Sequence, residues 1–290
     1  MRGESQQALA CVRARIKWWF EAFRNCYSEN ADRYVGALPM NNMKQAMADK
    51  RQTFGLWLAL ASPGVGVIAS NAGFDWVLVD CEHGPYDLTR LETQLMALHG
   101  HPADVVVRVP IAQDWVLKQA LDLGAQTVMI PMINTVADAK AAVAACKYPP
   151  QGMRGMGAAL ARASLYNHNP NYTSTANDDI CVILQLETQQ ALENLEDIAA
   201  IPGIDALFIG PTDLGADMGY PGQVGVPQVV DAVDDGIRRI HAAGLASGLI
   251  AFDAQGQKKY ADLGVSFIGV GSDTTLMQTA CCDLAARLGR

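Results

Sequence analysis

"VLVDCEHGP", residues 77–85, begins as an apolar run and ends in ionisable side chains. Val77–Val79 are typical of a strand that is buried on both faces. Asp80, Glu82 and His83 follow within four residues, before a Gly-Pro pair that breaks the strand. A strand of this kind belongs to the core, and its polar end indicates a site.

The same pattern repeats along the chain from residue 53 onward. Short apolar runs alternate with segments of helical apolar spacing, such as residues 88–100 and 136–148. The predicted strands are Phe54–Leu58, Trp76–Val79, Val105–Val109, Thr127–Ile130, Cys181–Leu186, Ala206–Ile209, Ala246–Ile250 and Phe267–Val270. Eight strands separated by helices favour a (β/α)8 TIM barrel over an open sheet. No Gly-x-Gly-x-x-Gly motif opens a helix after the first strand, which argues against a dinucleotide-binding fold.

The chain divides into a short N-terminal extension and one barrel domain. Its 290 residues, half of them hydrophobic, suffice for a single large barrel. Residues 1–38 differ from the rest, because "CVRARIKWWFEAFRNC" (11–26) places apolar residues at helical spacing among basic ones. This segment fits a surface-binding amphipathic helix, a targeting segment, or an extension read from a misassigned start, with Met40 or Met43 as the first residue. We expect it to be non-essential and residues 39–290 to form the barrel.

Composition excludes several classes of partner and compartment. The net charge of −8 argues against a nucleic-acid or anionic-membrane surface. No apolar run reaches the roughly 18 residues of a membrane span. Seven cysteines form an odd set without a Cys-x-x-Cys pair, which is typical of reduced thiols in a cytoplasmic protein.

Two stretches favour a homo-oligomer. Tyr148–Asp179 is the longest irregular stretch, rich in Pro, Gly, Asn and Arg, and a loop of that length is typically a lid or an interface. The C-terminal "TLMQTACCDLAARLG" (275–289) has apolar residues suited to docking on a neighbouring subunit.

Polar residues end four of the predicted strands. They are Asp80, Glu82 and His83 after the second strand, Arg108 in the third, Gln185 and Glu187 at the fifth, and Asp213 after the sixth. A barrel's active site lies at the carboxyl ends of its strands, so we expect these side chains to converge. Each has a structural alternative: an Asp-x-x-His pair is more often a structural hydrogen bond, and a strand-end carboxylate often caps the next helix. Four such features at one barrel end argue against coincidence.

The residue types indicate a chemistry. Glu187 and Asp213 come from adjacent strands, and two carboxylates suit a hard divalent cation that keeps positions for substrate and water. A zinc site would need several His or Cys ligands. Arg108 offers a planar fork to a carboxylate or enolate oxygen, and His83, with Asp80 three residues upstream, suits a base. No lysine ends a strand, so a Schiff-base mechanism lacks its nucleophile.

These motifs resemble the HpcH/HpaI family of class II pyruvate aldolases. The resembling stretches run from about Phe54 to Thr275 and are "FGLWLAL", "NAGFDWVLVDCEHGP", "VVVRVP", "IPMINT", "KYPPQGMRGMGAALARAS", "LQLET", "IGPTDLGADMGYPG" and "GVGSDTTL". The resemblance implies retro-aldol cleavage of a 4-hydroxy-2-oxo acid to pyruvate and an aldehyde. Its leading substrate is 4-hydroxy-2-oxoheptane-1,7-dioate, which yields succinate semialdehyde in aromatic compound catabolism. A 2-dehydro-3-deoxyglucarate-type aldolase, a CoA-thioester lyase relative and a catalytically silent barrel remain alternatives.

The resemblance also implies roles for individual residues. Glu187 and Asp213 would bind Mg²⁺, Mn²⁺ or Co²⁺, with no organic cofactor. His83, paired with Asp80, would take the proton of the 4-hydroxyl, and Arg108 would stabilise the oxyanion. The further substrate-binding residues would be Trp57, Gln185, Ile250, Gly210, Pro211 and Thr212, with the backbone N–H of Asp213. Thr212 stands where a small residue is expected. The resemblance further implies a homohexamer, built as a trimer of dimers.

Overall fold

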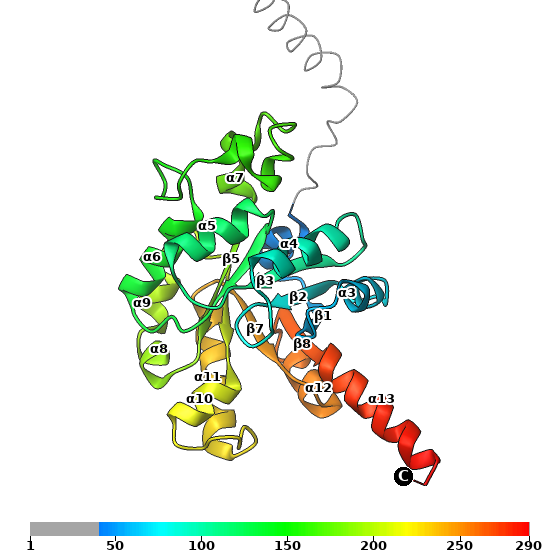
Figure 1. The fold of residues 1–290 in the computed structure, drawn as a ribbon. Coiled ribbons are helices and arrows are strands. Elements are labelled where there is room, and N and C mark those ends of the chain that lie inside the picture. The colour runs from blue at the N-terminus through cyan, green and yellow to red at the C-terminus, as the bar shows by residue number, and fades with distance from the viewer. Residues whose placement is uncertain (1–40, 290) are drawn as a thin grey trace, which may run out of the picture.

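The computed structural model describes residues 41–289 and shows a closed barrel (Figure 1). Within this range eight parallel strands pair in chain order, and the last pairs with the first. They are β1 (Thr53–Leu58), β2 (Trp76–Asp80), β3 (Asp104–Arg108), β4 (Thr127–Ile130), β5 (Cys181–Leu186), β6 (Ala206–Ile209), β7 (Ala246–Ile250) and β8 (Phe267–Ser272). The predicted (β/α)8 TIM barrel is confirmed, with strand ends that agree to within two residues.

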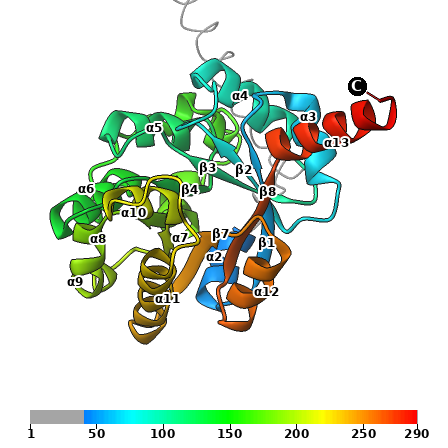
Figure 2. The same cartoon turned by 90° about the horizontal axis from the view of Figure 1, so that it is seen from below.

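Helices connect the strands and surround the barrel (Figure 2). They are α3 (Pro63–Ser70), α4 (Leu88–Ala97), α5 (Asp114–Asp122), α6 (Val136–Cys146), α7 (Tyr172–Asp179), α8 (Gln189–Glu193), α9 (Leu195–Ala199), α10 (Pro211–Asp217), α11 (Pro227–Ala242), α12 (Ala254–Asp262) and α13 (Asp273–Arg287). None of the helices in the described range is long and apolar enough to cross a membrane.

Strand side chains alternate between the barrel interior and the shell beneath the helices. In β2, Trp76 and Leu78 belong to the interior cluster, whereas Val77 and Val79 pack in the outer shell. Asp80 continues the interior set by the two-residue period of a strand. The polar end of β2 therefore projects into the mouth of the barrel and not into the helix layer.

Aromatic rings fill the barrel interior. Trp76 stacks on Phe267 with ring centroids 3.9 Å apart, and Trp57 lies edge-on to Trp76 at 5.6 Å. Glycines on the adjoining strands make this packing possible, because a Cβ on Gly55 or Gly269 would overlap the ring of Trp76 or Trp57 respectively. The site above these rings therefore rests on a close-packed floor.

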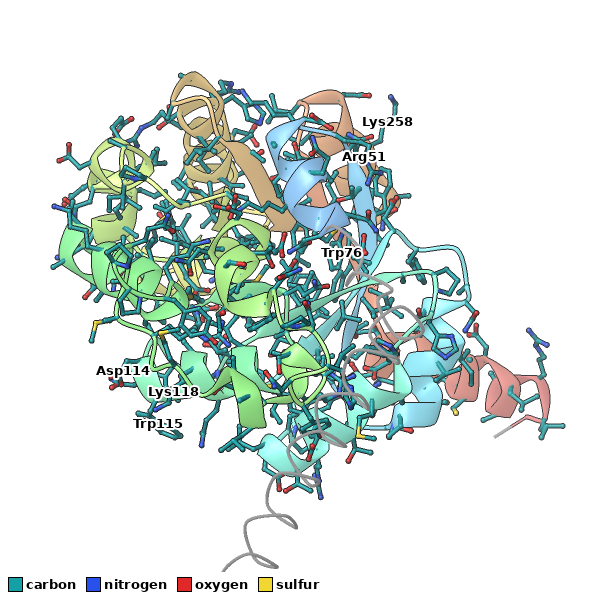
Figure 3. The ribbon with its side chains drawn as sticks, turned by 90° about the horizontal axis from the view of Figure 1, so that it is seen from above. Arg51, Trp76, Asp114, Trp115, Lys118 and Lys258 are labelled. Atoms are coloured by element: carbon teal, nitrogen blue, oxygen red, sulfur yellow. The ribbon has the colours of Figure 1, made fainter. Side chains whose placement is uncertain are left out.

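Helix α2 (Asn42–Ala48) closes the amino end of the barrel, and Figure 3 views this end with Trp76 labelled beside it. Asn41 accepts from the backbone N–H of Lys44 and donates to the carbonyl of Gln126 at 2.9 Å. Met43 and Met47 are fully buried against the interior cluster. The predictions for residues 1–38 lie outside the described residues.

The Tyr148–Asp179 stretch is not irregular throughout and cannot be a lid. It contains two 3₁₀ turns, Ala158–Leu160 and Arg162–Ser164, as well as α7. Since it joins α6 to β5, it lies at the amino end of the barrel, opposite the mouth. Lys147 fixes it there by donating to the carbonyls of Asn177 and Ile180. The lid interpretation is wrong, and the interface interpretation stays a prediction.

Helix α13 projects away from the barrel, as Figures 1 and 2 show. Asp273 is its buried residue and accepts from the backbone N–H groups of Ala59 and Leu60. Beyond this contact the helix exposes Leu276, Met277, Leu284 and Arg287, together with the following Leu288. In the described part of the chain, the helix after β8 therefore does not pack along the barrel as the eighth helix of this fold normally does.

Candidate active site

Asp80 and Arg108 form a buried ion pair at the mouth of the barrel. They are register partners at the ends of β2 and β3, and both face the interior. Arg108 Nε donates to Asp80 Oδ1 at 2.9 Å, and Nη2 donates to Oδ2 at 2.6 Å. Burial lowers the pKa of Arg108, but its bonds to Asp80 outweigh this effect and raise it. The pair fixes the plane of a permanently charged guanidinium.

Glu82 is a member of this cluster to which sequence reasoning gave no role. Its Oε2 lies 2.9 Å from Nη1 of Arg108. Burial raises the pKa of Glu82, Arg108 lowers it, and the charges of Asp80 and Asp213 raise it further. Its position in the Asp-Cys-Glu-His run at the end of β2 is the sequence feature that indicates a role at the site. With three nitrogens engaged, Arg108 keeps one N–H on Nη1 and one on Nη2 for another acceptor.

The structure gives Asp80 a different partner from the predicted His83 ring. Asp80 Oδ1 accepts from the backbone N–H groups of Glu82 and His83 at 3.1 and 3.2 Å, and its carboxylate faces Arg108. His83 itself is exposed on the turn after β2. Asp80 therefore shapes the turn that carries His83 and orients Arg108, because its carboxylate bonds to the backbone of that turn and to the guanidinium, and not to the imidazole.

Glu187 is buried at the end of β5, with 2 % of its surface exposed. Its Oε1 accepts from the backbone N–H of Met132 at 2.9 Å, and Oε2 lies 3.4 Å from Nε2 of Gln185. A Cβ on Gly210 would come within 2.5 Å of Oε2, so only glycine lets the next strand approach this closely. Burial, followed by the charges of Glu82 and Asp213, raises the pKa of Glu187 to about 7 against the effect of the Met132 bond.

Asp213 lies in the first turn of α10, the helix that follows β6. Strand β6 is the neighbour of β5, at whose end Glu187 lies. Gly210 is the N-cap, and Pro211 occupies the first helical position, where its missing N–H costs nothing. The first bond within the helix runs from Leu214 N to Gly210 O. The N–H groups of Thr212 and Asp213 therefore have no acceptor within the helix and are free to bind an anion.

Three buried polar atoms at the mouth or in the barrel beneath it have no hydrogen-bond partner among residues 41–289. They are Trp57 Nε1, Gln185 Oε1 and Glu82 Oε2, the last of which has only its ion pair. Trp57 packs inside the barrel instead of standing in the open mouth, and Ile250 is half-buried at the end of β7. Polar atoms left in this state at strand ends are typical of a site that completes its bonding with a ligand.

The charges fit a divalent cation. Asp80 neutralises Arg108, which leaves Glu82, Glu187 and Asp213 in excess. After burial, the charge of Asp213 contributes to the raised pKa values of Glu82 and Glu187. Oxygen donors suit Mg²⁺ or Mn²⁺. Within residues 41–289 no three His, Cys, Asp or Glu side chains form a ready-made metal group. A cation at Glu187 and Asp213 would therefore take its other ligands from water or substrate, as the sequence predicted.

Two cavities lie away from these residues. One of about 320 Å³ lies at the amino end and is lined by His101 and Arg162, among others. Another of about 400 Å³ lies between α4 and α5, behind Cys81, and includes Trp115, which Figure 3 labels. Neither contains a candidate catalytic or metal-binding residue, so the chemistry of the strand ends locates the site better than cavity size does.

Comparison with known proteins gives consistent matches. The HpcH/HpaI aldolase/citrate lyase family matches residues 53–280. A hydroxypyruvate/pyruvate aldolase of Deinococcus radiodurans is 47% identical over 246 residues, covering 85% of this chain and 89% of that protein. A 4-hydroxy-2-oxo-heptane-1,7-dioate aldolase of Salmonella heidelberg is 45% identical over 249 residues, covering 86% and 95%.

A solved structure agrees with the fold. It is an HpcH/HpaI aldolase/citrate lyase family protein from Burkholderia cenocepacia, with a TM-score of 0.83 and 35% sequence identity. The match covers 86% of this chain and 100% of that one. All the strand ends that carry the candidate site fall within residues 53–280.

Proposed function

The chain belongs to the HpcH/HpaI aldolase/citrate lyase family, and we propose that it is a divalent-metal-dependent aldolase that forms pyruvate. It is a carbon–carbon lyase by family and by the names of its relatives. The proposed reaction cleaves a 4-hydroxy-2-oxo acid to pyruvate and an aldehyde. The observation that carries it is the buried Glu187, which lies beside Gly210 and close enough to Asp213 and Arg108 for their charges to shift its pKa.

Glu187 and Asp213 would hold the cation, which when bound supplies Lewis-acid stabilisation of negative charge on the 2-oxo oxygen. The backbone N–H groups of Thr212 and Asp213 would bind the carboxylate of the pyruvate half at the start of α10. Thr212 would place its hydroxyl near this carboxylate, and it removes no catalytic group. These contacts place the bond to be broken above the Trp57 floor.

Arg108 would stabilise the oxyanion as the carbon–carbon bond breaks. Its two unused N–H groups are available to the oxygen that gains charge, and Asp80 holds them in one plane. A donor fixed before the reaction needs no reorganisation, and losing such a donor costs about 10²–10³ in rate. His83 would take the proton of the 4-hydroxyl, from its exposed position on the turn after β2.

The aldehyde half is proposed to be succinate semialdehyde, from 4-hydroxy-2-oxoheptane-1,7-dioate, in aromatic compound catabolism. A relative named for that substrate supports this at 45% identity. A relative named for hydroxypyruvate and pyruvate at 47% identity supports a second candidate, in which hydroxypyruvate replaces pyruvate. A 2-dehydro-3-deoxyglucarate-type substrate remains the alternative 4-hydroxy-2-oxo acid.

A substrate panel with Mn²⁺ tests the proposal. The dioate, 2-dehydro-3-deoxyglucarate and a 3,4-dihydroxy-2-oxo acid are incubated with the full chain, and pyruvate and hydroxypyruvate are measured. We expect pyruvate from the first two, loss of activity with EDTA, and recovery on adding Mn²⁺. Release that is unaffected by complete chelation would contradict metal dependence, and no release from any substrate would contradict the aldolase.

We also propose that the protein is a cytoplasmic homohexamer. Helix α13 exposes apolar residues and does not pack along the barrel, so α13 of one copy suits the corresponding face of another. Cys81, Cys146 and Cys181 are buried free thiols, consistent with a reducing compartment. Light scattering at assay concentration checks the assembly. We expect a hexamer, and a fully active monomer would contradict it.

A further inference from the structure

Met132 follows β4 and has an unusual backbone conformation. Its φ angle is +55°, in the left-handed region that a non-glycine residue rarely adopts. Its side chain is 49% exposed, so packing of the thioether does not hold the backbone there. A strained conformation persists only where its surroundings fix it, and such positions concentrate at functional sites.

Hydrogen bonds to the end of β5 hold the segment that contains Met132. Ile133 N donates to the carbonyl of Gln185 at 3.1 Å, and Asn134 Oδ1 accepts from Thr188 Oγ1 at 2.6 Å. Immediately before these two anchors, Met132 N donates to Glu187 Oε1 at 2.9 Å. Met132, Ile133 and Asn134 are therefore hydrogen-bonded to Glu187, Gln185 and Thr188, respectively. The left-handed turn directs one of these N–H groups at the Glu187 carboxylate.

The two oxygens of Glu187 have unequal surroundings. Oε1 is engaged by Met132, whereas Oε2 lies against Gly210, the N-cap of the helix that carries Asp213. The contact of Oε2 with Gln185 is long, at 3.4 Å. Oε2 is thus the less engaged of the two oxygens.

We propose that Met132 is a positioning residue whose left-handed backbone N–H holds Glu187 Oε1 and leaves Oε2 to bind the metal. The inference rests on the proposed function, since it needs a metal at Glu187. The thioether takes no part in it. A hydrogen bond from a backbone N–H to a carboxylate is of the strong, charge-assisted kind, and it would fix the direction of an otherwise rotatable ligand.

Four substitutions separate the backbone from the side chain. Met132→Gly and Met132→Asn permit a positive φ, Met132→Leu is the matched control for the side chain, and Met132→Ile disfavours a positive φ because it is β-branched. Mn²⁺ binding to the metal-free full chain is measured by calorimetry. We expect the Kd of the Gly, Asn and Leu variants to stay within about threefold of wild type, and that of the Ile variant to rise about tenfold.

Hydrogen exchange by mass spectrometry gives a readout that does not depend on the Ile variant folding. In a peptide covering residues 131–135, Glu187→Ala should make one amide exchange at least about tenfold faster, because the Met132 N–H loses its acceptor. Unchanged exchange would overturn the inference, as would equal Kd values for the Ile and Leu variants. Failure of the wild-type protein to bind Mn²⁺ would instead overturn the proposed function, with the exchange experiment still deciding the Met132–Glu187 contact.

Discussion

The two ends of the barrel both bury charged side chains, but they satisfy them differently. At the amino end, Lys147 donates to two carbonyls, and Arg154 donates to Asp122 and is covered by the rings of Tyr148 and Tyr172. These cations have partners within the described chain. At the carboxyl end the charge is mainly negative, because Glu82, Glu187 and Asp213 outnumber the charge that Arg108 has left beside Asp80. Buried polar atoms without a partner occur at both ends, among them Arg154 Nε and Gln185 Oε1. The amino end is built to hold the chain together, and the carboxyl end is built to receive a ligand.

The largest effect should follow from Glu187→Gln. The amide keeps an acceptor for the Met132 N–H but removes the negative charge, so we expect kcat to fall by more than about 10³-fold. The midpoint of thermal unfolding should not decrease, because a buried charge has been removed. Steady-state kinetics and calorimetry measure the two quantities. A large loss of stability would mean that the carboxyl end is also structural and would break the comparison.

Arg154→Met tests the opposite end. The substitution keeps an unbranched side chain but leaves Asp122 and the hydroxyl of Tyr172 without their donor, at a cost of about 3 kcal/mol in the free energy of unfolding. We expect kcat of the folded variant to stay within about twofold of wild type, since additivity holds for distant sites. Urea unfolding and kinetics are the measurements. A fall in kcat comparable with that of Glu187→Gln would show that the two ends are coupled.

His83→Ala sharpens the functional assignment of the carboxyl end. General-base loss should slow aldol cleavage about 10²-fold, whereas oxaloacetate decarboxylation, which passes through the same enolate, needs no hydroxyl deprotonation and should change little. Both reactions are followed by pyruvate release. Equal losses in the two reactions would assign His83 to binding or structure instead.

A smaller effect concerns pH. The pKa of Glu187 is raised to about 7 in the metal-free protein, so its carboxyl group is protonated below that pH. Because a metal binds the ionised form, binding releases this proton below pH 7. We expect Mn²⁺ affinity to fall about tenfold per unit as the pH decreases below 7, and to level off above it. Calorimetric titrations at several pH values check this, and a flat profile between pH 5 and 7 would contradict it.

The interior pattern of the strands explains how much the sequence could predict. The alternation that buries Trp76 and Leu78 inside the barrel also places Asp80 there, so the convergence of strand ends followed from apolar periodicity and fold class. The Asp80–Arg108 pair did not follow, since it needs the β2–β3 register, which sets these two residues side by side. The predicted Asp80–His83 arrangement relied on sequence spacing, whereas the Asp80 carboxylate bonds to the backbone of the turn and to Arg108.

Other features of the structure cannot be predicted from the types of the side chains. The hydrogen bond from Met132 to Glu187 uses a backbone N–H and a left-handed φ angle, and the identity of residue 132 as methionine predicts neither of them. The outward direction of α13 did not follow from the sequence, because its apolar residues do not indicate which of them pack on the barrel. The Tyr148–Asp179 stretch was mistaken for a possible lid because composition does not reveal at which end of a barrel a loop lies.

The most direct test of the account is the position of a bound metal. Crystals grown with Mn²⁺ can be examined by anomalous scattering, which locates the ion without assuming its ligands. We predict one strong peak at the carboxyl end, in bonding distance of Glu187 Oε2 and the carboxylate of Asp213, with the Met132 N–H still on Oε1. A peak at other residues, or none at Glu187 in crystals of protein that binds Mn²⁺ in solution, would contradict the central claim.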